Sequence, residues 1–381
     1  LGHAAGDAML MHAAEVLKNA TRDDDFVARV GGDEFVILME GQASAARLEG
    51  LSRQVLDVTS QSIRFQGQPC RSSVSIGIAS AKGPDIEPQN LLMNADIALY
   101  RAKNKGRNRF EHFTASLQAE IAAAKTCADE ILWGLDNGAF CCHYQPQFNA
   151  KSLEIVGVEA LARWQHPEKG LLPPPAFLKT AEDINVVADI DLLVLEQALA
   201  ARREWISNGV FVPRVSVNVS TKRLRQDDLV PRLREKNIEP GVLSFELLES
   251  IFLDDEEDEF IGRQIGQLHE LGIGIDIDDF GTGHASIVGL LRTKPHRLKI
   301  ARELVGPIVD SDQQRDLVRS IIEIGHSVGV EVVAEGVETM AHADHLAAMD
   351  CDILQGYAFG RPMSGADFFS FAQSRGWKAV S

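Results

Sequence analysis

The stretch from Ile273 to Gly283 reads Ile-Gly-Ile-Asp-Ile-Asp-Asp-Phe-Gly-Thr-Gly, and it contains the pattern from which we predict the fold. A short β-rich run, Ile273 to Ile277, leads directly to the acidic pair Asp278 and Asp279. A run of this kind, bounded by a glycine-rich segment, is typical of a strand. The loop from Asp279 to Gly283 is then either a plain connection or a mobile loop that closes on a ligand, and its residues alone favour neither.

The same arrangement recurs along the C-terminal two-thirds of the chain, where short β-rich runs alternate with helices expected at 189–207, 255–271 and 312–328. Strands that alternate with helices predict a mainly parallel sheet, and about eight strands over roughly 240 residues predict a closed TIM-like (β/α)8 barrel of the α/β class. Active sites of such barrels lie where the strands end. Several runs lead to a polar residue at that point: Glu159, Asn218, Glu246, Asp278, Lys299, Glu335 and Gln355.

Length and composition indicate a soluble protein of two domains. The chain has 381 residues, of which 45% are hydrophobic and 24% charged, so there is enough apolar material for two cores. No apolar run approaches the ~18 residues of a membrane span, and we expect a cytoplasmic chain. The net charge of −17 argues against a polymeric nucleic acid partner, which favours a basic surface. The five cysteines are expected to be reduced packing residues.

The N-terminal third reads as a smaller α+β domain. The turn Gly31-Gly32-Asp33-Glu34 lies between two short β-rich runs and predicts an antiparallel hairpin. We expect helices at 8–17, 43–60 and 90–104, and strands at 26–30, 35–39, 63–65 and 73–79. An Ala-rich helical segment at 114–138 then leads into the barrel. The predicted domains are therefore 1–113 and 131–381, joined by a helical connector at 114–130.

The polar residues at the predicted strand ends indicate a metal centre if they meet at one barrel mouth. Clustered carboxylates repel one another, and divalent cations relieve that repulsion. Oxygen ligands without cysteine suit Mg²⁺ or Mn²⁺, and two ions about 3.5–4 Å apart are the usual device for attack of water on a phosphodiester. Lys299 would orient the water or stabilise the phosphorus centre. Each carboxylate taken singly is more simply a solvated loop residue, but recurrence favours the site. The candidate ligands are Glu159, Asn218, Glu246, Asp278, Asp279 and Glu335.

A set of short motifs between residues 120 and 365 carries a family likeness. The run Glu159-Ala160-Leu161 is followed by Arg163 and Trp164. The other motifs are Tyr144-Gln145-Pro146, His166-Pro167, Val217-Asn218-Val219-Ser220, Glu246-Leu247-Leu248-Glu249-Ser250, Asp278 to Gly283, Leu298-Lys299-Ile300, Val333 to Thr339 and Gln355-Gly356-Tyr357. Together they resemble the EAL domain, a cyclic di-GMP phosphodiesterase module. The resemblance implies metal-dependent hydrolysis of cyclic di-GMP to linear pGpG, with two Mg²⁺ or Mn²⁺ ions per active site.

The resemblance also implies a role for each matching position. Lys299 matches the residue that helps to position the catalytic water, and Gln355 matches a position that binds water or supports a ligand. Arg163 matches a phosphate-binding residue, and Gln145 and Gln355 are expected with it in the substrate site. Glu249 matches the residue that holds the loop from Asp279 to Gly283. The six candidate ligands named above match the metal ligands of the family. The residues expected to carry catalysis are Glu159, Asp279, Lys299 and Glu335.

Two departures from the family pattern leave alternatives open. His284-Ala285-Ser286 stands where the family usually has Tyr-Ser-Ser, and Ala301 stands where it usually has Asp. Loss of that acidic neighbour affects the expected rate more than the expected binding. One alternative is therefore a cyclic di-GMP receptor with little turnover, and another is a bifunctional cyclase and phosphodiesterase in a longer parent chain. The retained carboxylates favour the phosphodiesterase.

The N-terminal domain carries the intact signature Gly31-Gly32-Asp33-Glu34-Phe35. Other matching segments are Gly2-His3-Ala4-Ala5-Gly6-Asp7, Ser75-Ile76-Gly77, Ala95-Asp96 and Lys103 to Asn108. They resemble the GGDEF domain, the diguanylate cyclase module. The resemblance implies that Asp7 contacts guanine. From their spacing, we expect Lys103 and Arg107, four residues apart on a helix, to share a face toward phosphates. Arg22-Asp23-Asp24-Asp25 resembles the family's RxxD inhibitory site, in which Arg22 and Asp25 would hold cyclic di-GMP.

The start of the chain shapes the expectation for this domain. The chain begins at the Gly2-His3 segment, so the family's first strand and its metal-binding Asp are missing. We therefore predict that this chain makes no cyclic di-GMP and that its GGDEF domain is inactive or regulatory, with GTP or cyclic di-GMP as its ligand. We expect a longer parent with an upstream sensor domain, which could be membrane-tethered. By analogy with EAL domains alone, we expect a homodimer.

Overall fold

A computed structural model of the chain describes residues 2–41, 44–81, 87–249, 259–282 and 293–375. By their internal contacts the residues divide into two compact units, 1–126 and 127–381. Helix α4 (Ala115–Asp136) contains the boundary between the two units. The sequence departure at His284, the loop residue Gly283 and the motif residue Ser250 lie outside the described residues.

The N-terminal unit combines helices with short paired strands. The predicted hairpin is present, since β1 (Phe26–Gly31) and β2 (Glu34–Leu38) pair antiparallel with Phe26 opposite Leu38. Gly32 in its turn has φ +51°, a left-handed conformation that glycine adopts without strain. Helix α2 begins where the side chain of Ser44 accepts a hydrogen bond from the backbone N–H of Arg47. The helices are α1 (Gly2–Ala20), α2 (Ala45–Thr59) and α3 (Pro88–Asn104).

Two further strands of this unit were not predicted from the sequence. Strand β4 (Gln68–Cys70) pairs antiparallel with β3 (Ile63–Phe65). Strand β6 (Phe110–His112) pairs parallel with β5 (Ile76–Ile78), which lies 30 or more residues earlier in the chain. Each of these strands has three residues, too few for an alternating pattern to be recognised. Their formation depends on partners that the local sequence does not specify.

In the C-terminal unit, eight of the described strands close into a barrel, which confirms the predicted architecture. Around the barrel the order is β8-β10-β11-β12-β13-β14-β15-β7, and pairing of β7 with β8 closes the ring. Neighbouring strands from β8 through β10 to β15 run parallel. The strands are β7 (Phe140–Asn149), β8 (Ile155–His166), β10 (Val215–Asn218), β11 (Leu243–Leu248), β12 (Gly274–Phe280), β13 (Arg297–Ile300), β14 (Glu331–Ala334) and β15 (Ile353–Leu354).

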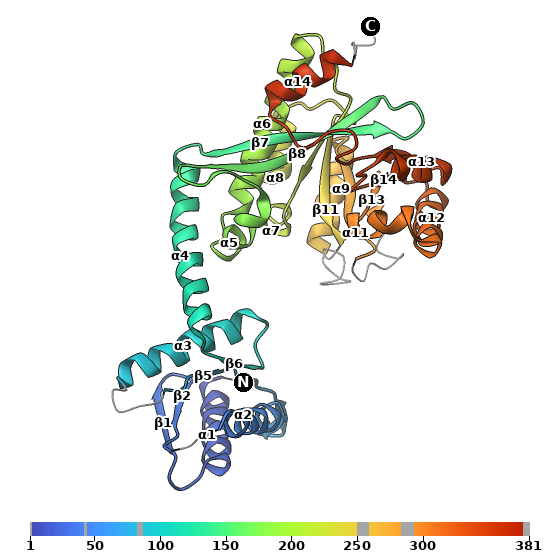
Figure 1. Ribbon diagram of the computed structural model, residues 1–381. Helices are drawn as coiled ribbons and strands as arrows, with labels where there is room; N and C mark the ends of the chain where they lie inside the picture. The colour runs from blue at the N-terminus through green and yellow to red at the C-terminus, as the bar shows by residue number, and fades with distance from the viewer. Residues whose placement is uncertain (1, 42–43, 82–86, 250–258, 283–292, 376–381) are drawn as a thin grey trace. The chain divides into compact units, whose positions relative to one another are not determined.

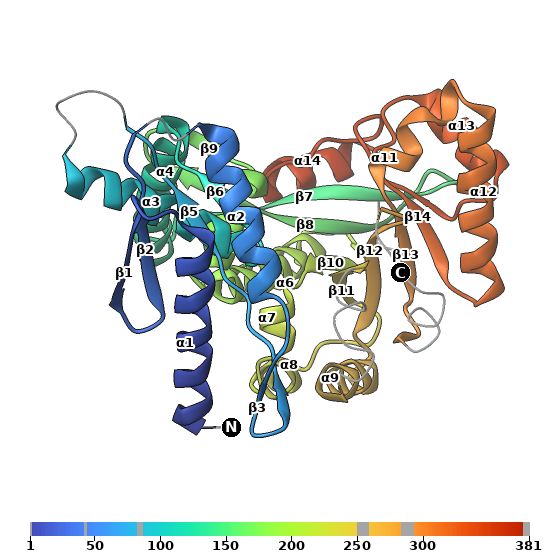
Figure 2. The ribbon, with the colours of Figure 1, turned by 90° about the horizontal axis from the view of Figure 1, so that it is seen from below.

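Strand β7 departs from the parallel pattern. It runs antiparallel to β8, with which it forms a long hairpin (Figure 2), and antiparallel to β15 on its other side. Strand β9 (Gly170–Leu172) extends the far end of β8 as a second antiparallel partner. The register of the hairpin places Gln145 opposite Glu159, so β7 brings glutamine side chains next to the acidic residue of β8.

Helices cover the outside of the barrel (Figure 1). Helix α6 packs on β7, β8 and β10, α9 packs on β12, and α12 packs on β13 and β14. Alternate strand residues such as Val217, Phe245 and Ile277 are buried, and the polar residues between them occupy the opposite face of each strand. The helices are α5 (Leu178–Asp183), α6 (Val187–Ser207), α7 (Thr221–Leu224), α8 (Leu229–Glu235), α9 (Glu259–Glu270), α11 (Arg302–Val305), α12 (Asp312–Ser327), α13 (Met340–Ala348) and α14 (Gly365–Ser374).

Two global features bear on the sequence expectations. None of the helices in the described part of the chain combines the length and apolar character that crossing a membrane requires. All five cysteines are free thiols in this structure, and Cys70, Cys142 and Cys351 are buried. Burial raises the pKa of the Cys142 and Cys351 thiols to about 12, so both behave as neutral packing residues.

Candidate metal centre

The polar residues predicted at strand ends come from neighbouring strands of the barrel, but not all of them lie at an end. Asn218 is the last residue of β10, and Glu335 and Gln355 directly follow β14 and β15. The prediction is wrong in detail for Glu159 and Glu246, which lie inside β8 and β11. Lys299, Asp278 and Asp279 likewise lie within their strands, Lys299 in β13 and the two aspartates in β12. These strands run on because backbone pairing with their neighbours continues past the polar residues.

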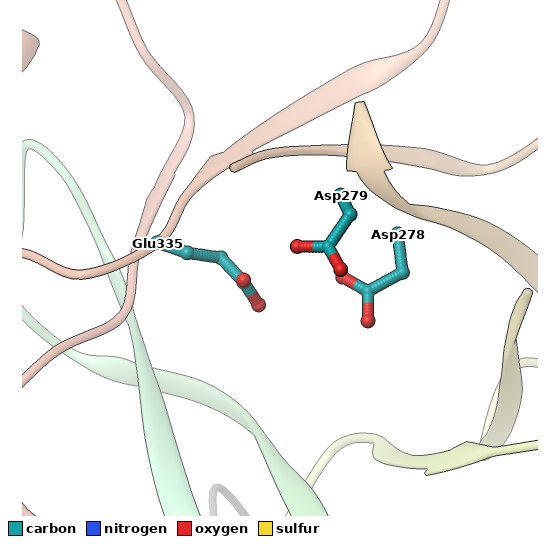
Figure 3. A group of neighbouring side chains, drawn as sticks. All are labelled: Asp278, Asp279 and Glu335. Carbon is teal, nitrogen blue, oxygen red and sulfur yellow. The ribbon is translucent and has the colours of Figure 1, made fainter. Parts of the chain in front are cut away.

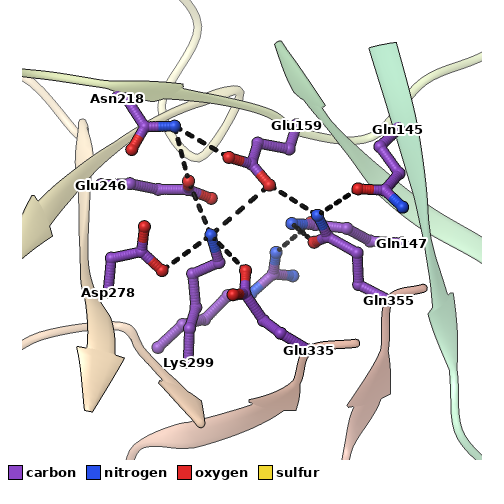
Figure 4. A network of polar contacts seen from close by, with 10 residues as sticks. Gln145, Gln147, Glu159, Asn218, Glu246, Asp278, Lys299, Glu335 and Gln355 are labelled. Carbon is purple, nitrogen blue, oxygen red and sulfur yellow. Dashed lines mark hydrogen bonds and ion pairs between the residues drawn. The ribbon is translucent and has the colours of Figure 1, made fainter. Parts of the chain in front are cut away.

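Lys299 lies at the centre of the carboxylates (Figure 4). Its Nζ lies 2.7 Å from Oε2 of Glu246 and 2.7 Å from Oε1 of Glu335. The same nitrogen lies 3.0 Å from Oδ1 of Asp278 and 3.5 Å from Oε2 of Glu159. The lysine side chain is 1% exposed, so these contacts are made in an environment of low effective dielectric. One ammonium thus faces four carboxylates, and the cluster holds an excess of negative charge.

Side-chain amides complete the cluster. Asn218 Nδ2 donates to Oε1 of Glu159 at 2.8 Å and to Oε2 of Glu246 at 3.3 Å. Gln355 Nε2 donates to Oε2 of Glu159 at 2.5 Å and to Oε1 of Gln145 at 3.2 Å. Both oxygens of Glu159 are therefore held by amide donors. In this structure the nitrogen of Asn218, not its oxygen, faces the two glutamates.

The crowding of like charges appears in the pKa values of the cluster. Burial raises the pKa of Glu246 well above its usual range, and the neighbouring charge of Glu159 adds to the rise. Burial also raises the pKa of Glu335, to about 8. Burial opposes the ionisation of Glu159. The charge of Lys299 and the hydrogen bonds that Glu159 accepts outweigh this effect, so the pKa of Glu159 is lowered. The pKa of Lys299 is raised because the charges of Asp278, Glu159 and Glu246 outweigh its burial. One lysine therefore does not neutralise the cluster.

Asp278, Asp279 and Glu335 form a group that could hold a metal ion (Figure 3). One oxygen from each lies within 4.8 Å of the others. Asp279 has φ 55°, a left-handed conformation that is uncommon outside glycine, and burial and the adjacent charge of Asp278 raise its pKa. The donors are all carboxylate oxygens, which suits Mg²⁺ or Mn²⁺. The residues present therefore fit a divalent cation, which would relieve the charge excess.

Glu249 contacts the loop that follows β12. Its Oε2 accepts a hydrogen bond from the backbone N–H of Gly281 at 2.9 Å, and Glu249 itself is 4% exposed. Gly281 has φ +94°, and a Cβ at this position would lie 2.6 Å from the side chain of Leu304. The described start of the loop is thus tied to the end of β11, the strand next to β12.

Arg163 lies four residues after Glu159 in β8, on the same face of the strand. It is partly buried, and its Nη1 donates to the backbone oxygen of Ala162 at 2.7 Å.

Ala301, the position of the second departure, is fully buried and precedes α11.

The candidate residues of the N-terminal unit are placed differently. Asp7, Arg22 and Asp25 line one cavity of about 780 Å³. Oδ2 of Asp25 accepts from the backbone N–H of Arg22 at 2.9 Å and pairs with Arg47 Nη2 at 2.7 Å. Arg47 is a partner that the motif did not reveal. Of the signature residues, Gly32 and Asp33 form the hairpin turn, Gly31 ends β1, and Glu34 and Phe35 begin β2.

The expectation that Lys103 and Arg107 share a helical face is wrong. Helix α3 ends at Asn104, and Lys105 closes it with a backbone N–H to the oxygen of Arg101. Gly106 has φ +102° and Arg107 has φ 58°, so the chain turns away from the helix axis before it reaches Arg107. A glycine two residues past the helix supplies that turn, and the i, i+4 relation of a helix does not apply.

The sequence also did not reveal Gln147 and Arg297, whose side chains lie in the barrel interior next to this cluster. Gln147 is 1% exposed and contacts Gln355, while Arg297 is 4% exposed and contacts Gln147. The available signal was alternation, since Gln147 follows Gln145 by two residues and Arg297 precedes Lys299 by two.

Comparison with known proteins gives concordant matches along most of the chain. Residues 128–362 match the family described as EAL domain, and residues 1–109 match the family described as diguanylate cyclase, GGDEF domain. MucR of Pseudomonas aeruginosa, a bifunctional diguanylate cyclase/cyclic di-GMP phosphodiesterase, is 34% identical over 366 residues, which cover 95% of this chain and 53% of MucR. The signaling protein YkoW of Bacillus subtilis is 32% identical over 376 residues, 97% of this chain and 47% of YkoW. The chain thus spans about half the length of these curated relatives.

Solved structures agree with the barrel. The MucR phosphodiesterase in complex with c-di-GMP is 33% identical with a TM-score of 0.60, covering 64% of this chain and 99% of that chain. The EAL enzyme Bd1971, in a form bound to cAMP and cyclic di-GMP, is 28% identical with a TM-score of 0.62, covering 75% of this chain and 76% of that chain.

Proposed function

This chain belongs to the EAL domain family and carries a GGDEF domain before its EAL domain, and from that premise we propose that it hydrolyses cyclic di-GMP to linear pGpG. The observation that supports this most directly is the convergence of Glu159, Glu246, Asp278 and Glu335 on Lys299 inside one barrel. Family relatives described as acting on or binding cyclic di-GMP supply the substrate class.

The proposed reaction breaks one phosphodiester bond. A water oxygen bonds to phosphorus, the bond from phosphorus to the leaving sugar oxygen breaks, and the water proton passes to that oxygen. Two bound Mg²⁺ or Mn²⁺ ions would polarise the phosphate and make water a better nucleophile. We assign their retention to Glu159, Asn218, Glu246, Asp278, Asp279 and Glu335.

The remaining residues act on the substrate and the water. Lys299, held among carboxylates, supplies a positive charge that orients the water and stabilises charge on the phosphate. Arg163, on the same face of β8 as Glu159, binds a phosphate oxygen, and Gln145 and Gln355 border the substrate beside it. Glu249 holds the start of the loop after β12 against the site.

For the N-terminal residues 1–113 we propose a regulatory role. The cavity lined by Asp7, Arg22 and Asp25 offers a place for GTP or cyclic di-GMP, although Asp25 is already paired with Arg47. The connector 114–130 would transmit the presence or absence of a nucleotide in this cavity to the domain at 131–381. Homodimer formation and control by a sensor in a longer parent chain complete the proposal.

A receptor with little turnover is the second candidate, and the buried Ala301 is the observation that favours it. One experiment separates the two. Purified protein is incubated with cyclic di-GMP and Mg²⁺ or Mn²⁺, and the products are resolved by chromatography. Formation of pGpG at many turnovers per protein, lost with EDTA, supports the enzyme. Binding of cyclic di-GMP without pGpG would instead make the chain a receptor.

A further inference from the structure

A row of polar side chains, exposed at Glu331 and buried from Arg297 onward, crosses the barrel interior beside the metal centre. Glu331 Oε2 accepts from Arg297 Nε at 3.0 Å, and Gln147 Oε1 accepts from Arg297 Nη1 at 3.1 Å. Gln147 Nε2 then donates to Gln355 Oε1 at 2.9 Å, and Gln355 Nε2 donates to Glu159 Oε2 at 2.5 Å. Figure 4 shows Gln147 beside Gln355 and Gln355 next to Glu159. We call this row, from Arg297 through Gln147 to Gln355, the amide relay.

Every hydrogen bond of the amide relay has a forced direction. A guanidinium has only N–H donors, so the group of Gln147 that faces Arg297 must be its oxygen. Its NH₂ therefore faces Gln355, whose oxygen must turn toward it. The NH₂ of Gln355 is then left facing Glu159. With either amide reversed, two acceptors or two donors would meet inside the barrel, which costs about 1–3 kcal/mol for each buried polar group left unpaired.

The NH₂ group of Gln355 faces a second acceptor, Gln145, as well as Glu159. Gln145 Nε2 donates to the backbone oxygen of Gly360 at 3.1 Å, so the Gln145 oxygen is the group that faces Gln355. The space beside the amide relay is also limited. A Cβ on Gly157, which lies opposite Gln147 in the β7–β8 hairpin, would sit 2.9 Å from Gln147 Oε1. The absence of a side chain at Gly157 therefore leaves the room that the Gln147 amide occupies.

We infer that Arg297 is a positioning residue for the metal centre. By fixing the orientation of Gln147 and Gln355, it presents an N–H rather than a lone pair to Glu159 and holds that carboxylate toward the other ligands. This inference rests on the proposed metal site. Groups that orient a metal ligand without touching the metal contribute roughly 10- to 100-fold to metal affinity.

Charge gives the inference a test with a distinctive sign. Arg297→Met removes a buried positive charge, and loss of a nearby cation by itself strengthens binding of Mn²⁺. Loss of amide orientation weakens it. A fall in Mn²⁺ affinity in Arg297→Met therefore cannot arise from the change of charge. Gln147→Met breaks the relay with no change of charge, and it serves if the arginine variant fails to fold.

The experiment measures Mn²⁺ binding to the full chain by the electron paramagnetic resonance of free Mn²⁺, without substrate. We expect the dissociation constant to rise about 10-fold in Arg297→Met and in Gln147→Met. Arg297→Lys, which keeps the charge and a donor, recovers most of the affinity. Glu331→Gln, which alters only the exposed end of the row, leaves it within about twofold of the wild type.

The outcomes separate the relay from the proposed function. If the wild-type chain binds no Mn²⁺, the proposed metal site is wrong. If the wild type binds Mn²⁺ and both relay variants bind it equally well, the relay inference alone is overturned. A loss in Glu331→Gln as large as in Arg297→Met, or no recovery in Arg297→Lys, also overturns it.

Discussion

The ammonium of Lys299 lies 2.7 Å from Oε1 of Glu335, and burial raises the pKa of that glutamate to about 8. Even in direct contact with a buried cation, Glu335 does not regain an ordinary acidity, because its burial and the nearby charges of Asp278 and Glu159 both oppose its ionisation. One lysine therefore does not balance the charge of the carboxylates, and a bound cation would stabilise the cluster.

Replacement of Lys299 by Met should lower stability in the absence of metal and increase the stabilisation that bound metal provides. Without metal, four carboxylates lose their buried partner, and we expect a loss of about 3–5 kcal/mol in the free energy of unfolding. Mn²⁺ should restore more stability in the variant than in the wild type, while hydrolysis falls by roughly 10²–10³-fold. Urea unfolding in EDTA and in Mn²⁺, with pGpG assays, measures both. Equal stabilisation by Mn²⁺ in the two proteins would contradict the prediction.

Asp278→Ala should abolish hydrolysis through loss of a metal ligand, because its oxygen lies with those of Asp279 and Glu335. Glu323→Gln, which removes a carboxylate charge from an exposed position of α12, is the control and should keep full activity. Initial rates of pGpG formation at saturating Mn²⁺ measure the difference. Turnover of Asp278→Ala within about tenfold of the wild type would mean that the ligand assignment is mistaken.

Glu249→Ala should lower kcat by about 10–100-fold, since the loop after β12 loses the acceptor for the Gly281 N–H and a small displacement suffices to slow catalysis. Glu249→Gln keeps a carbonyl oxygen at that point and should retain most of the activity. Steady-state kinetics of the pair, beside Mn²⁺ affinity, test the assignment. A pair of equally impaired variants would indicate that the charge of Glu249, not its hydrogen bond, matters.

Gly356→Ala should destabilise the barrel by about 1–3 kcal/mol or more, because a Cβ there would lie 2.3 Å from the backbone N and O of Val337. Backbone atoms cannot move aside as a side chain can. Gly266→Ala in α9 meets no atom within 4 Å and should stabilise by up to about 1 kcal/mol, since alanine favours a helix interior. Urea midpoints of the two variants should therefore move in opposite directions.

Asp191 gives a pH dependence that lies outside the metal centre. Burial raises its pKa from 3.8 to about 6, despite hydrogen bonds from the N–H and hydroxyl of Ser220. Between about pH 4 and pH 6 the folded chain keeps a proton that the unfolded chain releases, so stability from this group falls as pH rises. Wild-type stability should therefore decline more over this range than that of Asp191→Asn. Urea unfolding at each pH measures the free energy of unfolding of both proteins. The same decline in both between pH 4 and pH 6 would contradict the prediction.

Much of the fold could be predicted because its signals are local. The apolar run before Asp278 and the Gly31–Gly32 turn each specify a strand or hairpin within a few residues, and the spacing of such runs indicates a barrel. The three-residue strands β4 and β6 could not be predicted because their partners are set by tertiary packing. The helix that was expected to carry both Lys103 and Arg107 ends at Asn104, where a nearby glycine turns the chain.

The sequence by itself determined the order of the two domains, the barrel class and the kinds of side chain available for a metal centre. Only the tertiary structure decided that Lys299 stands among the carboxylates and that Gln147 meets Gln355, a residue 208 positions away. The physical reason is register. Side chains alternate between the two faces of a strand, so a shift of one residue in the pairing would turn every one of these groups out of the barrel.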